Sequence, residues 1–231
     1  MATKVDGLLF DKDGTLFDFH ATWSVWAAFV IRDLAGGDDA VTARLATVLH
    51  YDLVAEQFLP SSPVIAGTNR EAAECIAQEL PKRSVEEIEH YLMMTASEVP
   101  QTPSLPLEPY LSGLAAQGLA LGVMTNDNEY SARAHLKSAG IDGHFDFIAG
   151  FDSGFGAKPA PGPLLAFAKS AGLAPDRVAM VGDSTHDLIA GRAAGMQTIG
   201  VLTGLAESQE LTPYADIIFP DIGHIPAWLT Q

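Results

Sequence analysis

Basic side chains are scarce in this sequence. Its 231 residues include 13 Lys+Arg against 29 Asp+Glu, which leaves a formal net charge of −16 at pH 7. A surface this acidic repels phosphate backbones and anionic lipid headgroups, so the composition argues against a nucleic-acid partner and against a membrane. Solubility alone is another explanation for a net charge of this size. An anionic substrate would have to be attracted locally, by a metal ion or by helix N-termini.

Cysteine and long apolar runs are also nearly missing. The single cysteine, Cys75, excludes an intramolecular disulfide and fits a reducing compartment. Within a predicted helix, we expect it to be a small buried hydrophobe. No apolar run approaches the roughly 20 residues that a membrane-spanning helix needs, and the run at the N-terminus is too short for a signal peptide. We therefore expect a cytoplasmic protein.

Short apolar runs alternate with helical patterns over most of the chain. Six such runs predict strands, at 5–10, 119–124, 145–149, 177–181, 198–202 and 216–219. Helical patterns lie between most of them, at 108–117, 128–139, 161–172 and 185–195. Strands separated by helices of this length indicate an α/β fold with a doubly wound parallel sheet.

Residues 17–104 interrupt this alternation. They contain helical patterns but no segment that we predict as a strand; the patterns lie at 20–35, 39–57, 69–80 and 84–98. Asp38 and Ser84 fit the N-caps of two of these helices. The sequence thus predicts a core domain of residues 1–16 and 105–231, with an α-helical domain of residues 17–104 inserted after the first strand.

Two carboxylates follow the first predicted strand, in Asp11-Lys12-Asp13-Gly14-Thr15. Open parallel sheets bind ligands at the carboxyl ends of their strands, and two neighbouring acids repel each other unless a cation offsets their charge. Mg²⁺ suits a site of few carboxylates and several waters. Taken alone, the segment could also be a turn or a fragment of a calcium loop, although the downstream acid of an EF-hand is absent.

Polar residues follow later strands as well. Thr125 and Asn126 come after the second core strand, where backbone amides that open a helix form an anion site. Lys158 lies past the third strand and can neutralise phosphate oxygens. Asp183 and Asp187 follow the fourth, one helical turn apart. A turn, a solvated lysine or a helix cap could explain each one singly, but together they predict one crevice with Asp183 facing a metal ion.

Four segments of this chain, DKDGT, Thr125-Asn126, Lys158-Pro159 and GDSTHD, resemble the four motifs of the haloacid dehalogenase superfamily in the order of that family. The resemblance covers essentially the whole chain, and the helical insert resembles the type-one cap of phosphoglycolate phosphatase-like members. It implies a magnesium-dependent phosphomonoester hydrolase that acts through an aspartyl-phosphate intermediate on a small phosphorylated metabolite. The motifs are specific for the superfamily and only weakly specific for the substrate, for which 2-phosphoglycolate is the first suggestion.

The resemblance also implies a role for each matched residue. Asp11 would be the nucleophile, and Asp13 would protonate the leaving oxygen and then activate the attacking water. Mg²⁺ would be held by Asp11, Asp183 and the backbone carbonyl of Asp13. The remaining matched residues fall into two supporting groups: Thr125, Asn126 and Lys158 would hold the phosphate oxygens, and Thr15 and Asp187 would support the site from behind. Because the superfamily's carbon–halogen hydrolases keep no acid at the position of Asp13, its presence favours phosphate chemistry.

The helical insert is expected to close over the crevice as a lid. His20 and Trp23, close to the nucleophile in sequence, are its candidate substrate contacts. One of its arginines could bind a substrate carboxylate; the candidates are Arg32, Arg44 and Arg70. We expect His186, between the two acids of the fourth motif, to be exposed.

Other activities stay compatible with these residues. A sugar phosphomutase would return the phosphate to its substrate rather than to water. A phosphonate hydrolase would use Lys82, the only lysine between residues 17 and 105, as a Schiff base. A non-catalytic binding protein could have kept the fold alone. A monomer and a homodimer both fit the sequence.

Overall fold

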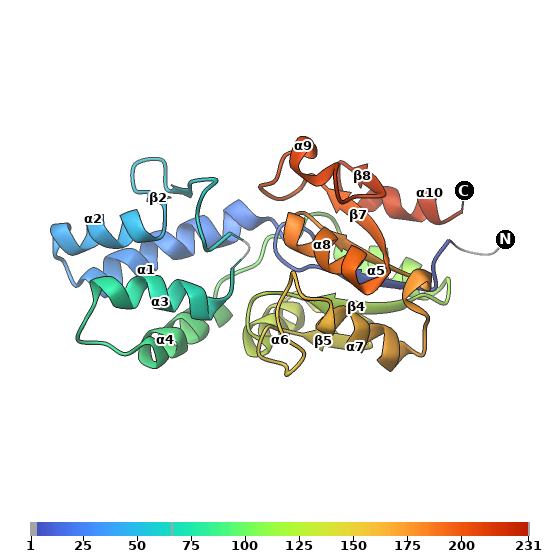
Figure 1. Cartoon of the computed structure of the whole chain (residues 1–231), viewed down its shortest axis with the longest axis horizontal. Coiled ribbons are helices and arrows are strands. Elements are labelled where there is room, and N and C mark those ends of the chain that lie inside the picture. The colour runs from blue at the N-terminus through green and yellow to red at the C-terminus, as the bar shows by residue number, and fades with distance from the viewer. Residues whose placement is uncertain (1–3, 66, 231) are drawn as a thin grey trace.

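The computed structural model describes residues 4–65 and 67–230 and arranges them in two lobes (Figure 1). The α/β lobe is a parallel sheet covered by helices. The helical lobe, whose helices lie between His20 and Ser97, enters the chain after the first strand of that sheet. The predicted fold class, an α/β doubly wound sheet with an inserted helical region, is therefore confirmed.

Six parallel strands form the main sheet. Their spatial order is β5 (Phe147–Ala149), β4 (Ala120–Met124), β1 (Gly7–Phe10), β6 (Val178–Gly182), β7 (Gln197–Val201) and β8 (Ile217–Phe219). In register, Phe10 of β1 pairs with Val123 on one side and with Val181 on the other. The chain builds the sheet from β1 to β5 in one direction and from β6 to β8 in the other. The strand order therefore reverses between β1 and β6, where open α/β sheets bind their ligands.

The helices of the α/β lobe cover both faces of this sheet. They are α5 (Leu107–Ala115), α6 (Glu129–Ser138), α7 (Gly162–Ala171), α8 (Thr185–Ala194), α9 (Ser208–Leu211) and α10 (Ile225–Leu229), with 3₁₀ turns at Asp142–His144, Pro175–Arg177 and Ile222–His224. Leu8 and Phe10 of β1 belong to the buried cluster that includes α5 and α10, whereas Leu9 belongs to the cluster that includes α7 and α8. A strand buried on both faces is apolar throughout, which explains the continuous runs in the sequence.

The helical lobe has a hydrophobic core of its own. Its helices are the π-helical turn η1 (His20–Ser24), α1 (Val25–Ala35), α2 (Asp39–Val48), α3 (Asn69–Glu79) and α4 (Val85–Ser97). The Asp38 side chain accepts two backbone N–H bonds at the start of α2, and Ser84 forms a capping box with Glu87 at the start of α4, as predicted. No helix in the described part of the chain is long and apolar enough to cross a membrane.

A small hairpin in the helical lobe corrects the prediction. The helix predicted for 39–57 stops at the end of α2, and β2 (Tyr51–Asp52) pairs with β3 (Gln57–Phe58) in an antiparallel sheet where no strand was predicted. His50 has a φ of 49°, which ends the helical course of the backbone. The two aromatic rings of the hairpin pack 5.2 Å apart. Strands of two residues are too short to show an alternating pattern in a sequence.

Two chain segments join the lobes and run side by side. The Asp18 N–H donates to the Thr102 carbonyl at 2.8 Å, and the Ser104 N–H donates to the Leu16 carbonyl at 2.9 Å. The outgoing segment begins directly after the loop that follows β1. The helical lobe is therefore attached beside the carboxyl end of β1, where the site residues were predicted.

Candidate active site

Three neighbouring strands carry the centre of the candidate site at their carboxyl ends. Asp11 follows β1, Thr125 follows β4 and Asp183 follows β6. The Asp11 N–H donates to the Val181 carbonyl at 2.8 Å, which ties the β1 loop to β6. Within this loop Gly14 has a φ of +81°, and a Cβ at this position would collide with the Asp183 carboxylate. Both the turn and the close approach therefore require glycine.

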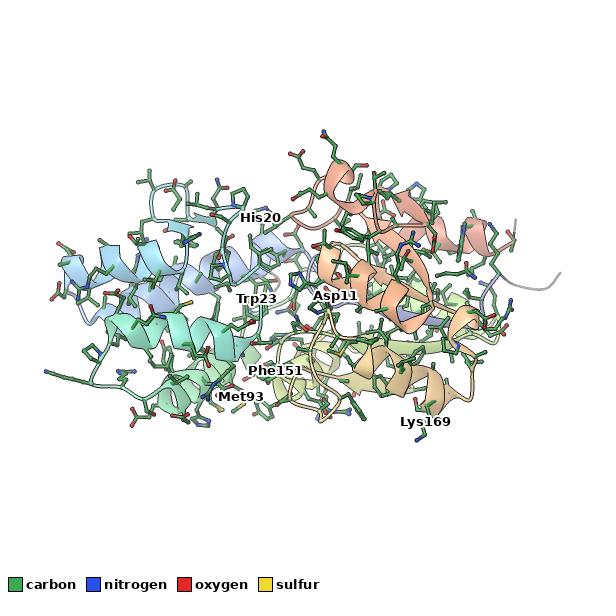
Figure 2. All side chains as sticks on the ribbon, viewed as in Figure 1. Asp11, His20, Trp23, Met93, Phe151 and Lys169 are labelled. Carbon is green, nitrogen blue, oxygen red and sulfur yellow. The ribbon has the colours of Figure 1, made fainter. Side chains whose placement is uncertain are left out.

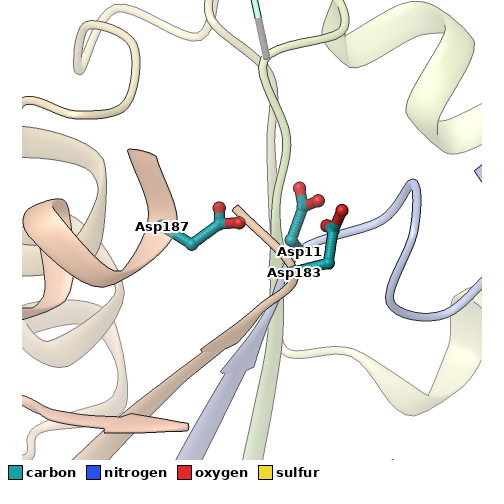
Figure 3. A group of neighbouring side chains, drawn as sticks. All are labelled: Asp11, Asp183 and Asp187. Atoms are coloured by element: carbon teal, nitrogen blue, oxygen red, sulfur yellow. The ribbon is translucent and has the colours of Figure 1, made fainter. Parts of the chain in front are cut away.

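Three carboxylates crowd together at this point (Figure 3). Asp11, Asp183 and Asp187 are buried, and one oxygen of each lies within 4.8 Å of the others. Burial, with the neighbouring negative charges, raises the pKa of Asp11 to about 7 and that of Asp183 well above its usual value. Hard oxygen donors with an excess of negative charge suit a divalent cation such as Mg²⁺, which would offset their repulsion.

Further polar groups hold the carboxylates of this cluster in place. Asp187 Oδ2 accepts from the Ser184 hydroxyl at 2.7 Å and from the Ser184 N–H at 3.0 Å, which also caps α8. Its Oδ1 accepts from Lys158 Nζ, so both oxygens are engaged within the protein. The fully buried Thr15 lies on the other side, with its hydroxyl 3.5 Å from Asp183 Oδ1.

Lys158 bridges two of the three carboxylates. Its Nζ lies 2.6 Å from Asp11 Oδ1 and 2.6 Å from Asp187 Oδ1. Burial alone would lower the pKa of Lys158, but the two negative charges outweigh it and raise the pKa above its ordinary value. Asn126 holds the lysine's backbone, accepting from the Lys158 N–H and donating to its carbonyl, both at 2.9 Å. Asn126 thus orients Lys158 as well as lining the pocket described below.

A second buried lysine, Lys12, was given no role by the sequence. Its side chain is fully buried, and its Nζ lies 2.8 Å from Asp13 Oδ2, 3.3 Å from Asp127 Oδ2 and 3.0 Å from His135 Nδ1. An ammonium group has three N–H donors, and these three partners can take all of them. The one available signal was a lysine directly after an apolar strand in a chain with only 13 basic residues.

The partners of Lys12 connect the two lobes. His135 Nε2 lies 2.8 Å from the carbonyl oxygen of Ala96 in α4, so Nε2 carries the hydrogen and Nδ1 accepts from Lys12. Burial and the charge of Lys12 lower the pKa of His135 to about 4. Burial raises the pKa of Asp127 to about 6, although Lys12 opposes this shift. The Lys12 ammonium also lies 5.1 Å from the centre of the Trp23 ring, a cation–π contact.

The central pocket, of about 60 Å³, lies between the lobes. From the α/β lobe it is lined by Asp11, Asp13, Thr125, Asn126, Lys158 and Asp183. From the helical lobe it is lined by Phe19, Trp23, Trp26, Val64, Ile65 and Asn69. The groups predicted to react with a phosphate and to hold it therefore face a largely apolar wall of the helical lobe.

The sequence comparisons agree with this geometry. The family model for haloacid dehalogenase-like hydrolases matches residues 5–195. This chain belongs to that family. It is 32% identical over 211 residues to the probable phosphatase IndB of Dickeya dadantii, covering 88% of this chain and 84% of that protein. It is 31% identical over 233 residues to a phosphoglycolate phosphatase of Neisseria meningitidis, covering 96% and 91% respectively.

The fold of this hydrolase is shared with solved structures. A haloacid dehalogenase-like hydrolase from Bacteroides fragilis matches it with a TM-score of 0.75 at 23% identity, over 96% of this chain and all of the other. At this level of identity the match concerns the fold alone. The parallel sheet and the inserted helices therefore occur together in that solved structure as well.

Of the two substrate contacts predicted in the helical lobe, Trp23 lies at the central pocket and His20 does not. Trp23 is buried at the pocket, on the side of the helical lobe (Figure 2). His20 is exposed and lines a neighbouring cavity that also includes Glu210. His186 is half-buried at the mouth shared by these two cavities, rather than exposed. Cys75 is half-buried, at the edge of the helical lobe's core.

Proposed function

We propose that this hydrolase is a magnesium-dependent phosphatase that cleaves a small phosphomonoester through an aspartyl-phosphate intermediate. The observation that carries the proposal is the meeting of Asp11, Asp13, Lys158 and Asp183 around one pocket. Phosphoryl transfer needs a positioned nucleophile, a proton donor and positive charge around the phosphate, and these side chains offer all three when a cation is bound.

In the first half-reaction, a carboxylate oxygen of Asp11 attacks phosphorus while the bond from phosphorus to the ester oxygen breaks. Asp13 gives its proton to that oxygen, so the alcohol leaves in neutral form. In the second half-reaction, Asp13 takes a proton from the water that attacks phosphorus, and Asp11 is released together with inorganic phosphate. Mg²⁺, held by Asp11, Asp183 and the Asp13 carbonyl, would stabilise the charge on the transferring group.

The proposed phosphate cradle is supported by the surroundings of Lys158. The ammonium lies 2.6 Å from Asp11 Oδ1, close enough to the nucleophile to contact an oxygen of a phosphate bound there. Thr125 and Asn126 follow β4 on the same side, and the buried Asn126 amide fixes the lysine's backbone. We propose that these three residues bind the non-reacting oxygens. Preorganised charge of this kind supplies much of the catalysis in phosphoryl transfer.

2-Phosphoglycolate is the first ester to test, because a relative covering nearly the whole chain is named phosphoglycolate phosphatase. The experiment measures phosphate release from a panel of phosphomonoesters, with Mg²⁺ and with EDTA, by the native protein and by Asp11→Asn. Asp176→Asn, at an exposed acid far along the chain, is the matched control. We expect magnesium-dependent release that is lost in Asp11→Asn and kept in Asp176→Asn.

The same panel separates the other activities. A mutase would interconvert sugar phosphates without releasing phosphate. A phosphonate hydrolase would form a borohydride-trapped adduct at Lys82, which is exposed and does not line the central pocket. If folded protein with bound metal releases no phosphate from any ester, the proposed hydrolysis is wrong.

A further inference from the structure

The wall that faces the leaving group carries no charge among the described residues. The helical lobe contributes to the central pocket Phe19, Trp23, Trp26, Val64, Ile65 and Asn69, together with Gly67. All are apolar except the Asn69 amide, and its nitrogen is 3.4 Å from Asp127 Oδ1. Because Asp13, the proposed proton donor, also lines this pocket, this wall lies where the alcohol part of a substrate would sit.

The arginines that could have bound a substrate carboxylate lie elsewhere. Arg32 pairs with Glu56 at 2.6 Å, and Arg44 pairs with Glu79 at 2.9 Å. Arg70 reaches three glutamates, of which one is 2.9 Å away. None of the three arginines lines the central pocket. The structure therefore does not support the possibility, left open by the sequence, that one of them binds a substrate carboxylate.

Among the described residues that line the pocket from the α/β lobe, Lys158 is the one lysine or arginine, and His186 lies at the mouth. The carboxylates of this lining outnumber the lysine, and Lys158 already contacts Asp11 and Asp187. Lys12 is fully buried beyond the pocket lining, where Asp13 and Asp127 neutralise it. A second negative charge on a substrate would thus be enclosed without a partner, and burial of an unpaired carboxylate is strongly unfavourable.

The aromatic part of the wall is held in place before any substrate arrives. The Trp23 and Trp26 rings pack edge to face at 5.1 Å, and the Trp26 indole N–H donates to Thr95 Oγ1 at 3.1 Å. Lys12 and His135 contact the Trp23 ring from the α/β lobe. Fixed rings present apolar faces with partial negative charge, which suit an uncharged group and repel a carboxylate.

Resting on the phosphatase activity proposed above, we propose that the substrate's leaving group is uncharged and at least partly apolar. The site takes phosphomonoesters of neutral alcohols in preference to those of hydroxy acids. Specificity of this kind arises as much from the penalty on the charged competitor as from contacts with the favoured one.

The deciding experiment compares two esters of the same shape. 2-Phosphoglycolate and 2-phosphoglycolamide differ only in a carboxylate and a neutral amide, and ethyl phosphate keeps the two-carbon skeleton without either. We expect kcat/KM for the amide to exceed that for the carboxylate by about 100-fold, the penalty of enclosing one unpaired charge. Equal values, or a preference for 2-phosphoglycolate, would overturn the inference. If no ester is hydrolysed, the proposed phosphatase activity fails instead.

Two substitutions test the cause of the preference. Ile65→Arg adds a cation at the half-buried mouth of the pocket, and Ile65→Met is its uncharged control. We expect the arginine variant to raise kcat/KM for 2-phosphoglycolate at least roughly tenfold relative to the amide, and the methionine variant to leave the ratio unchanged. His186→Gln should also leave it unchanged. A selective loss of 2-phosphoglycolate turnover in His186→Gln would show that the histidine serves a carboxylate, and would contradict the inference.

Discussion

Two buried lysines each contact a carboxylate of the loop after β1, but they have different surroundings. Lys158 lies between Asp11 and Asp187 and lines the central pocket. Lys12 lies between Asp13 and Asp127 and does not line it. Each ammonium therefore bridges two carboxylates, but only the first can be reached by a ligand. We therefore expect the same local chemistry to serve binding in one place and positioning in the other.

The charge balance around the two lysines also differs. Asp183 adds a third carboxylate to the group around Lys158, so that group carries surplus negative charge and suits a divalent cation. Around Lys12 the third polar partner is the neutral ring of His135 rather than another acid. Enclosed in this way, Lys12 fixes the carboxylate of Asp13 by contacts to both of its oxygens.

The sharpest test of this contrast compares substitutions of the two carboxylates that contact Lys12, which are Asp13 and Asp127. Asp13→Asn removes the proposed proton donor, and we expect kcat to fall by about a thousandfold, within the range of general acid–base catalysis. Asp127→Asn removes the other partner of the same lysine and should lower kcat far less. Phosphate-release kinetics at saturating substrate measure both, and thermal unfolding confirms the fold. Comparable kcat values for the two variants would show that Asp13 is not the proton donor.

Replacing each lysine by methionine separates binding from positioning. Lys12→Met leaves the buried Asp127 and the half-buried Asp13 without a cation, and we expect the free energy of unfolding to fall by about 3 kcal/mol. Lys158→Met should cost a similar amount in EDTA. Urea titrations measure both, and Lys137→Met, at an exposed position, should change stability by no more than about 0.5 kcal/mol.

Magnesium should stabilise Lys158→Met more than Lys12→Met, because Lys12→Met keeps the proposed cation site as it is in the native protein. The acids left by Lys158→Met belong to the carboxylate cluster that suits a cation, so added Mg²⁺ is expected to restore part of its stability by mass action. The acids left by Lys12→Met include Asp127, which lies outside that cluster. An equal gain in stability for both variants on addition of Mg²⁺ would break the distinction between the two lysines.

The smallest expected effect concerns the pH dependence of stability. Folding lowers the pKa of His135 from its ordinary value of 6.5 to about 4, so the folded state binds fewer protons than the unfolded state between these values. Its contribution to stability is fully present above the unfolded pKa and is lost as the pH falls toward 4. We expect a loss of about 2 kcal/mol between pH 8 and pH 5.

His135→Gln removes this titration and keeps a polar side chain of similar reach. The difference in unfolding free energy between native protein and variant should therefore change over the same pH interval. The contributions of other titrating groups are the same in both proteins and cancel in this difference. Urea unfolding at several pH values measures that difference. A difference that stays constant with pH would mean that His135 has the same pKa in the folded and unfolded states.

The sequence predicted the α/β lobe well because its signals are local. Apolar runs mark strands buried on both faces, and polar residues directly after them mark the carboxyl edge of the sheet. Asp38 and Ser84 were predicted as caps from the two or three residues around them. The hairpin of β2 and β3 was missed because its strands are too short to alternate, and its rings meet only after the chain has turned.

The sequence by itself determined which groups end the strands: Asp11 after β1, Thr125 after β4 and Asp183 after β6. Only the tertiary structure decided which charges meet. Lys12 contacts His135, 123 residues away, and the arginines of the helical lobe pair with glutamates instead of facing the pocket. Strand and helix patterns come from neighbours in the chain, whereas the pairing of buried charges depends on how distant elements pack and on which groups the packing removes from water.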